Sequence, residues 1–166
     1  MKQIKGVVTG VVKEIDPAAG AVKVDFSWMQ PPQRSNWAPI ATVMSGNGRG
    51  MYYMPEIDDE ALIAFDQGEF DHPYVVGFMW NGVDAPPSTE QHLRLIHSVN
   101  GHEIGIYDPV DQAGGDKGFI RIQDAHGNMI ELGNGRIVIS GKGNLQISAP
   151  NVTINGRLVA PVGPPI

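Results

Sequence analysis

The sequence contains no cysteine, so neither a disulfide framework nor thiolate chemistry is available to this protein. It also lacks any run of about 18 apolar residues, the length that a membrane-spanning helix requires. The first ten residues, MKQIKGVVTG, include no apolar stretch of signal-peptide length. From these absences we expect a soluble chain that is made in the cytoplasm and that would leave the cell only by another route.

Positive charge is scarce: 12 Lys and Arg stand against 18 Asp and Glu, for a formal net charge of −6. Affinity for nucleic acid comes largely from cations that neutralise phosphates, so this balance argues against a protein that grips a nucleic-acid backbone. Glycine (21) and proline (13) are abundant, which is typical of many short strands joined by turns. The length of 166 residues allows one domain, or one compact domain plus an extension.

Aromatic residues are absent after Phe119, and the C-terminal third instead alternates apolar and polar side chains. Alternation with period two is typical of strands with one apolar face. The pairs recur every ~8 residues and are separated by Gly- and Asn-rich turns, the spacing of short, evenly placed strands. The apolar residues of the five pairs are Ile120, Ile122, Ile130, Leu132, Ile137, Ile139, Leu145, Ile147, Val152 and Ile154.

One chain cannot bury these apolar faces, because each unit contributes only two inward side chains. Three chains wound together would place three equivalent rows against one another and leave few open strand edges. We therefore predict that residues 117–160 form a needle, an intertwined trimeric β-helix or β-prism with these ten side chains in its core. The simpler alternative is a β-meander of hairpins within one chain.

The N-terminal half predicts a small barrel. Five strand-like segments occur before residue 81, at 4–15, 22–26, 37–44, 61–65 and 73–80, and this number suits a five-stranded OB fold. The all-β chain is then divided as follows: barrel 1–80, linker 81–91, transitional strands and loop 92–116, needle 117–160 and terminal tail 161–166.

Residues 37–81 resemble a known family over an ordered set of landmarks: WAPIATVMSGNGRGMYYMPEIDDEALIAF, then QGEFDHPYVVGFMWN. They are similar to the OB segment of phage baseplate assembly protein V, the central spikes of contractile phage tails and VgrG proteins of type VI secretion. The resemblance continues through RLIHSVNGHEIGIYD and IRIQDAHGNMIEL into the repeats. Asp58 stands where the family usually has glycine, and we expect it to take the same left-handed backbone conformation.

The resemblance implies a homotrimeric, non-enzymatic spike of a phage tail, tailocin or related injection system that pierces a membrane. It implies that the OB domains bind a tail tube or baseplate hub protein, that a PAAR-like tip protein caps the other end, and that the assembled particle is a virion tail or an extracellular contractile structure. The apolar C-terminus is predicted to dock the tip protein, through Val159, Ala160, Pro161, Val162, Pro164, Pro165 and Ile166.

We expect no catalytic residue, no metal site and no cofactor. The acidic segment 66–72 could in principle hold a cation, but solvated charge is the usual role of such a loop. The Gly-rich loop 46–50 lacks the helix and the Lys-Ser/Thr of a phosphate-binding loop. The alternative function is an OB module that binds carbohydrate or nucleic acid on exposed aromatic rings. Candidates are Trp28, Trp37, Tyr52, Tyr53 and Trp80, of which Trp37 and Trp80 are predicted to lie in the core.

Overall fold

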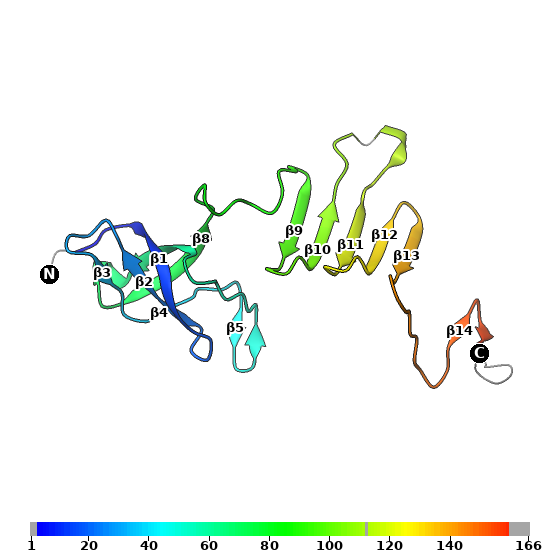
Figure 1. Ribbon diagram of the computed structural model, residues 1–166, viewed down its shortest axis with the longest axis horizontal. Coiled ribbons are helices and arrows are strands. Elements are labelled where there is room, and N and C mark those ends of the chain that lie inside the picture. The colour runs from blue at the N-terminus through cyan, green and yellow to red at the C-terminus, as the bar shows by residue number, and fades with distance from the viewer. Residues whose placement is uncertain (1–2, 112, 160–166) are drawn as a thin grey trace. The chain divides into compact units, whose positions relative to one another are not determined.

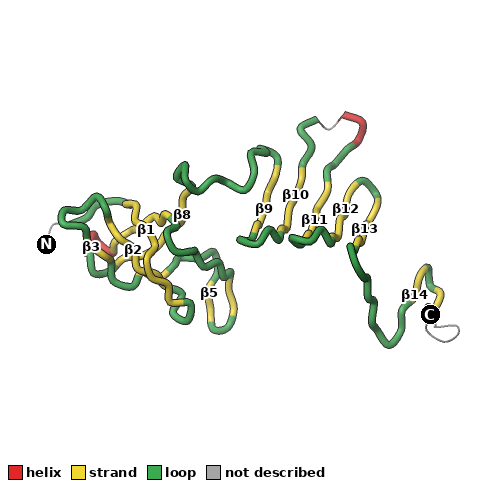
Figure 2. The backbone as a smooth tube through the Cα atoms, in the orientation of Figure 1, coloured by secondary structure: helices red, strands yellow, loops and turns green. Residues whose placement is uncertain are grey.

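The computed structural model describes residues 3–111 and 113–159, the side chain of Ala113 excepted. These residues form strands and two short 3-10 turns, η1 (Asp66–Gly68) and η2 (Ala113–Gly115). The chain divides into two compact units, Met1–Pro86 and Pro87–Ile166 (Figures 1 and 2). The division falls within the Pro-containing segment 81–91.

The first unit is a barrel built on one antiparallel sheet of order β3-β2-β1-β7-β8, with β4 also paired to β2. Ile40 follows β4 and makes a parallel bridge to Val75, which joins the β4 segment to β8. The strands of this sheet are β1 (Val7–Asp16), β2 (Ala21–Phe26), β3 (Gln33–Arg34), β4 (Ala38–Pro39), β7 (Glu60–Phe65) and β8 (Pro73–Met79).

Alternate residues of these strands point into the barrel and make its core, as the period-two pattern requires. Phe26 lies at its centre, with ring centroids 5.8 Å from Phe65 and 5.7 Å from Phe70. The buried cluster comprises Val12, Val22, Val24, Phe26, Ala38, Ala61, Ile63, Phe65 and Val75.

Segment 37–44 differs from the strand predicted for it. Only Ala38–Pro39 form strand β4, and the chain then leaves the barrel as a hairpin of β5 (Ser45–Gly46) and β6 (Arg49–Gly50). Trp37 and Trp80 are also not core residues. Trp80 follows the last residue of β8 and is 67% exposed, and Trp37 lies between β3 and β4 with Lys23 over its ring.

The second unit contains a five-stranded antiparallel meander in which each strand pairs with the next along the chain (Figure 1). A separate two-stranded hairpin follows. The strands of the meander are β9 (Leu93–His97), β10 (Glu103–Tyr107), β11 (Phe119–Gln123), β12 (Met129–Gly133) and β13 (Arg136–Ser140), and those of the hairpin are β14 (Thr153–Ile154) and β15 (Arg157–Leu158).

For residues 119–140 the structure shows pairing within one chain, as in the alternative of a β-meander, and the predicted intertwined β-helix is not shown there. Ile120 pairs with Leu132 and Ile130 with Ile139 in the same chain, so β12 has strands of its own chain on both sides. The physical reason lies in the turns. Asn134 and Gly135 have φ of 49° and 77°, and two consecutive positive φ values make the tight turn that returns a strand beside its predecessor. Leu145 and Ile147, predicted as a strand, lie in an extended segment outside any strand.

Candidate functional site

One side of the meander is an almost uninterrupted surface of branched aliphatic side chains. The register aligns Ile96 with Ile104, Ile104 with Ile122, Ile122 with Ile130, and Ile130 with Ile139. We call this surface the isoleucine face; its residues are Ile96, Ile104, Ile106, Ile120, Ile122, Ile130, Leu132, Ile137 and Ile139. They are between 41% and 70% exposed. A contiguous apolar surface of this kind marks an interaction site.

The opposite side of the meander has its own partners. Glu131 is only 7% exposed and accepts hydrogen bonds from Arg121, at 2.7 Å, and from Arg136, at 3.3 Å. Tyr107 and Phe119 stack at 4.4 Å, and Arg121 lies over both rings. The hydrogen bond from Arg121, reinforced by Arg136, lowers the pKa of Glu131, while burial and the hydrogen bond to Glu103 raise the pKa of Tyr107.

The two sides of the meander therefore differ in whether other groups of the chain cover them. Polar and aromatic groups of the second side satisfy one another within the chain. The isoleucine face has no such cover among the described residues. Burying the exposed half of one aliphatic side chain is worth about 1 kcal/mol, so a partner that covered the nine residues would bind strongly.

The segment after β13 keeps the alternation of apolar and polar residues but does not belong to the sheet. The backbone N–H of Lys142 donates to the Asn128 side chain at 2.8 Å, which ties the start of the segment to the β11–β12 turn. Beyond it, Leu145 and Ile147 are exposed and lie outside the described strands. β13 is an end strand of the meander, so its outer edge has no strand beside it among the described residues.

The predicted needle residues thus fall into two groups. Six of them, from Ile120 to Ile139, lie together on the isoleucine face, which also includes Ile96, Ile104 and Ile106 of β9 and β10. The other four, Leu145, Ile147, Val152 and Ile154, lie beyond the sheet. Sequence reasoning missed the contribution of β9 and β10, although the alternation in HEIGIY carried the signal.

Of the predicted tip residues, Val159 is described: it is exposed, and its N–H donates to the Val152 carbonyl at 2.7 Å. Ala160, Pro161, Val162, Pro164, Pro165 and Ile166 lie outside the described residues.

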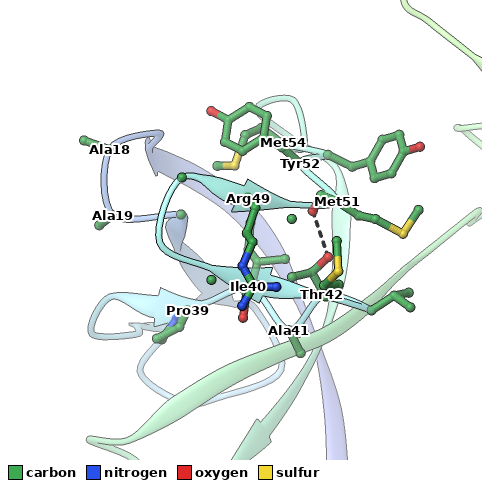
Figure 3. Close-up of a pocket in the computed structure, with 18 of the residues that line it drawn as sticks. Ala18, Ala19, Pro39, Ile40, Ala41, Thr42, Arg49, Met51, Tyr52 and Met54 are labelled. Carbon is green, nitrogen blue, oxygen red and sulfur yellow. Dashed lines mark hydrogen bonds between the residues drawn. The ribbon is translucent and has the colours of Figure 1, made fainter.

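A concavity of the barrel lies beside the β5–β6 hairpin (Figure 3). Its volume is about 960 Å³ and its lining includes Ile40, Met44, Met51, Tyr52 and Phe78. The lining is largely apolar, with Arg49 as its charged side chain. The sequence predicted only a Gly-rich loop at these residues. The apolar run MYYM after the glycines was the signal that could have indicated an apolar surface here.

The loops considered for chemistry have ordinary structures. Residues 46–50 belong to the β5–β6 hairpin and are not followed by a helix. In the acidic loop, His72 lies 3.2 Å from Glu69, and no cluster of three metal-ligating side chains occurs in the described ranges. Asp58 has φ of 77°, the left-handed conformation expected where the family has glycine.

Comparison with known proteins identifies the barrel. Residues 6–80 match the family model of the type VI secretion system/phage-baseplate injector OB domain. The barrel belongs to this family. It is a family of structural spike and baseplate proteins, generally non-enzymatic.

The curated relatives that this chain matches are distant. This chain is 25% identical over 121 residues to actin cross-linking toxin VgrG1 of Vibrio cholerae. The aligned part covers 68% of this chain and 11% of the toxin. The chain is 23% identical over 124 residues to type VI secretion system spike protein VgrG1a of Pseudomonas aeruginosa, covering 68% of this chain and 19% of that protein. The chain thus spans less than a fifth of the length of these relatives. In the ranges that the structure describes, no helix is long and apolar enough to cross a membrane.

Proposed function

We propose that this protein is the subunit of a homotrimeric central spike of a contractile phage tail, a tailocin or a related injection system. The observation that carries the proposal is the isoleucine face. Three copies arranged around an axis would turn these faces inward and bury them against one another, while the Glu131 side of each sheet stays outward. The match of residues 6–80 to an injector OB domain supports the same assignment.

We propose further that strand exchange between copies begins where the in-chain meander ends. Among the described residues no strand pairs with the outer edge of β13, and the segment with Leu145 and Ile147 keeps the alternating pattern without a strand partner. Seating this segment beside a strand of a neighbouring copy would pair its backbone groups and cover its apolar side chains. The intertwined part of the needle would then comprise residues 141–151 rather than the whole of 117–160, because Thr153–Ile154 and Arg157–Leu158 again pair within the chain.

In this role the protein is structural and not catalytic. The barrel end attaches to the tail tube or baseplate hub, and the needle end crosses the target membrane when the sheath contracts. Residues 159–166, which include no charged side chain, are the proposed docking platform for a PAAR-like tip protein. Deleting them should abolish co-purification with a tip protein while the native mass stays that of a trimer; unchanged tip binding would refute the platform.

The direct test of the proposal is the native mass of the full chain at micromolar concentration. We expect three copies of the 17.9 kDa chain in native mass spectrometry and in sedimentation. A monomer would contradict the proposed function, because the isoleucine face would then remain in water.

A second candidate is an OB module that binds sugars or nucleic-acid bases by stacking. The exposure of Trp28, Tyr52 and Trp80 favours it, since flat exposed rings are the platforms that such modules use. Titrating the protein with oligosaccharides and with single-stranded oligonucleotides while following tryptophan fluorescence tests this function. Saturable quenching by a monomer would support the binding module, and its absence would dismiss it.

A further inference from the structure

The hairpin beside the barrel concavity is a protruding arm, comprising residues 41–54. At its root the N–H of Ala41 donates to the Val75 carbonyl at 2.8 Å. Farther along, the N–H of Met51 donates to the Met44 carbonyl at 3.0 Å. The Thr42 hydroxyl donates to the Met51 carbonyl at 2.8 Å (Figure 3). Its two strands have only two residues each, and a two-stranded hairpin of this size is marginal without packing.

The arm is apolar and exposed. It presents two methionines, two tyrosines and a valine to solvent: Met44, Met51, Tyr52, Tyr53 and Val43. Its one charged residue is Arg49, whose guanidinium lies across the hairpin over Gly46. Five large apolar side chains exposed together on a hairpin are typical of an interaction surface, so we interpret the arm as a surface that contacts a partner.

A second apolar surface lies on the outer side of the same barrel. The register places Val7, Ala64 and Tyr74 side by side across β1, β7 and β8. Val7, Tyr74 and Val76 are exposed there, and we call the four residues Val7, Ala64, Tyr74 and Val76 the outer stripe. The loop 66–72 begins next to Tyr74 and carries the exposed carboxylates of Asp66, Glu69 and Asp71.

The arm and the outer stripe are complementary. Both are apolar, and the single cation of the arm matches the acidic loop that borders the stripe. They are also different surfaces of one domain, which is what a ring of identical subunits requires: each copy contributes one surface to one neighbour and the other surface to the other neighbour. Once the needle holds three barrels together, their high effective concentration lets a small contact form.

We propose that, within the trimer, the arm of each copy packs on the outer stripe of the next copy, with Arg49 beside that neighbour's acidic loop. This inference rests on the proposed trimeric spike and adds to it the contact between barrels. The occupant of the stripe is thus a second copy of this chain.

The absence of cysteine allows a clean test by crosslinking. A double variant, Tyr52→Cys with Val76→Cys, is treated with a short bis-maleimide, which avoids the strict geometry of a disulfide. A head-to-tail contact around three copies closes a covalent ring, so we expect a trimer band on a denaturing gel of samples heated until the untreated protein runs as a monomer. Each single variant should stay monomeric on that gel.

The matched control pairs Tyr52→Cys with Gln33→Cys. Gln33 is exposed on β3, at the other end of the sheet order from β8. We expect at least severalfold less covalent trimer from this control than from the test pair. Equal yields, or only internally linked monomers from the test pair, would overturn the arm contact while a trimeric native mass leaves the spike proposal standing. A monomeric native mass would overturn both.

Discussion

Gly118 precedes β11 at a point where only glycine fits. Its φ is +74°, and a Cβ built on it would lie 1.8 Å from the Tyr107 carbonyl oxygen. Gly135, in the β12–β13 turn, has nearly the same φ, +77°, with nothing within 4 Å of the added Cβ. An alanine at Gly135 would therefore test backbone strain alone, whereas an alanine at Gly118 would add a steric collision.

We expect Gly135→Ala to cost about 1–2 kcal/mol, the strain of a left-handed residue. Gly118→Ala should cost about 2–5 kcal/mol, because overpacking against the Tyr107 backbone adds to that strain. Denaturant unfolding of the two variants and the parent measures the difference. Equal losses would show that the β10–β11 connection relaxes to admit a methyl group.

Glu131 is a residue whose charge stabilises the fold. Hydrogen bonds from Arg121 and Arg136 lower its folded-state pKa below the unfolded value of about 4.3. A lowered pKa means that the stabilisation is complete above the unfolded pKa and is lost as pH falls through the folded pKa.

Glu131→Gln should therefore lower Tm at pH 7 and have a smaller effect at pH 3, because pH 3 lies below the unfolded pKa of about 4.3 and part of the stabilisation from the charge is lost there. Thermal melts of both proteins at the two pH values measure this. The parent will also lose stability in acid through Glu14 and Asp25, whose pKa values are lowered by hydrogen bonds from Lys23 and from Arg34, respectively. The quantity to compare between the two pH values is therefore the difference in Tm between parent and variant. A difference that grows in acid would contradict the role of the charge.

At the scale of elements, alternate side chains of each meander strand point to the isoleucine face or to the side that carries Glu131. Ile139 lies on the isoleucine face, whereas the next residue, Ser140, points to the side that carries Glu131. In a single chain both positions tolerate a carboxylate, since Ile139 is half exposed. In the proposed trimer only Ser140 still tolerates one.

Ile139→Asp should destabilise the trimer strongly, because it brings three carboxylates into one apolar core at a cost of several kcal/mol for each unpaired charge, roughly. Ser140→Asp should leave the trimer nearly unchanged. Native mass against denaturant concentration reports both. The pair Ile147→Asp and Gln146→Asp applies the same comparison to the exchanged segment. Equal effects within a pair would show that the inward face is wrongly assigned.

At the scale of the whole molecule, the proposed exchange of strands predicts kinetic stability. All three chains must separate before any one of them unfolds in full, so the unfolding barrier governs lifetime. We expect a trimer band in SDS at room temperature that converts to monomer on heating. Subunit mixing of tagged and untagged trimers measures the rate; exchange within minutes at room temperature would contradict strand exchange.

Local pattern determined much of this protein. Alternation located β11, β12 and β13 and indicated that Ile120 and Ile122 share one face of their strand, as do Ile137 and Ile139, because side-chain direction within a strand depends only on position parity. Asn-Gly marked the β12–β13 turn, since these residues adopt positive φ readily. The ordered landmarks from Trp37 to Asn81 led to the injector OB domain that the family match bears out.

Tertiary structure decided which strands pair and which apolar residues remain in water. The same alternation suits a strand paired within its chain and a strand paired with another, and only the closed turn at Asn134 and Gly135 with the register of β12 distinguishes them. Trp80 reads as core, yet it lies one residue beyond the end of β8. Parity is a property of neighbouring residues, whereas pairing and burial depend on segments distant in the sequence.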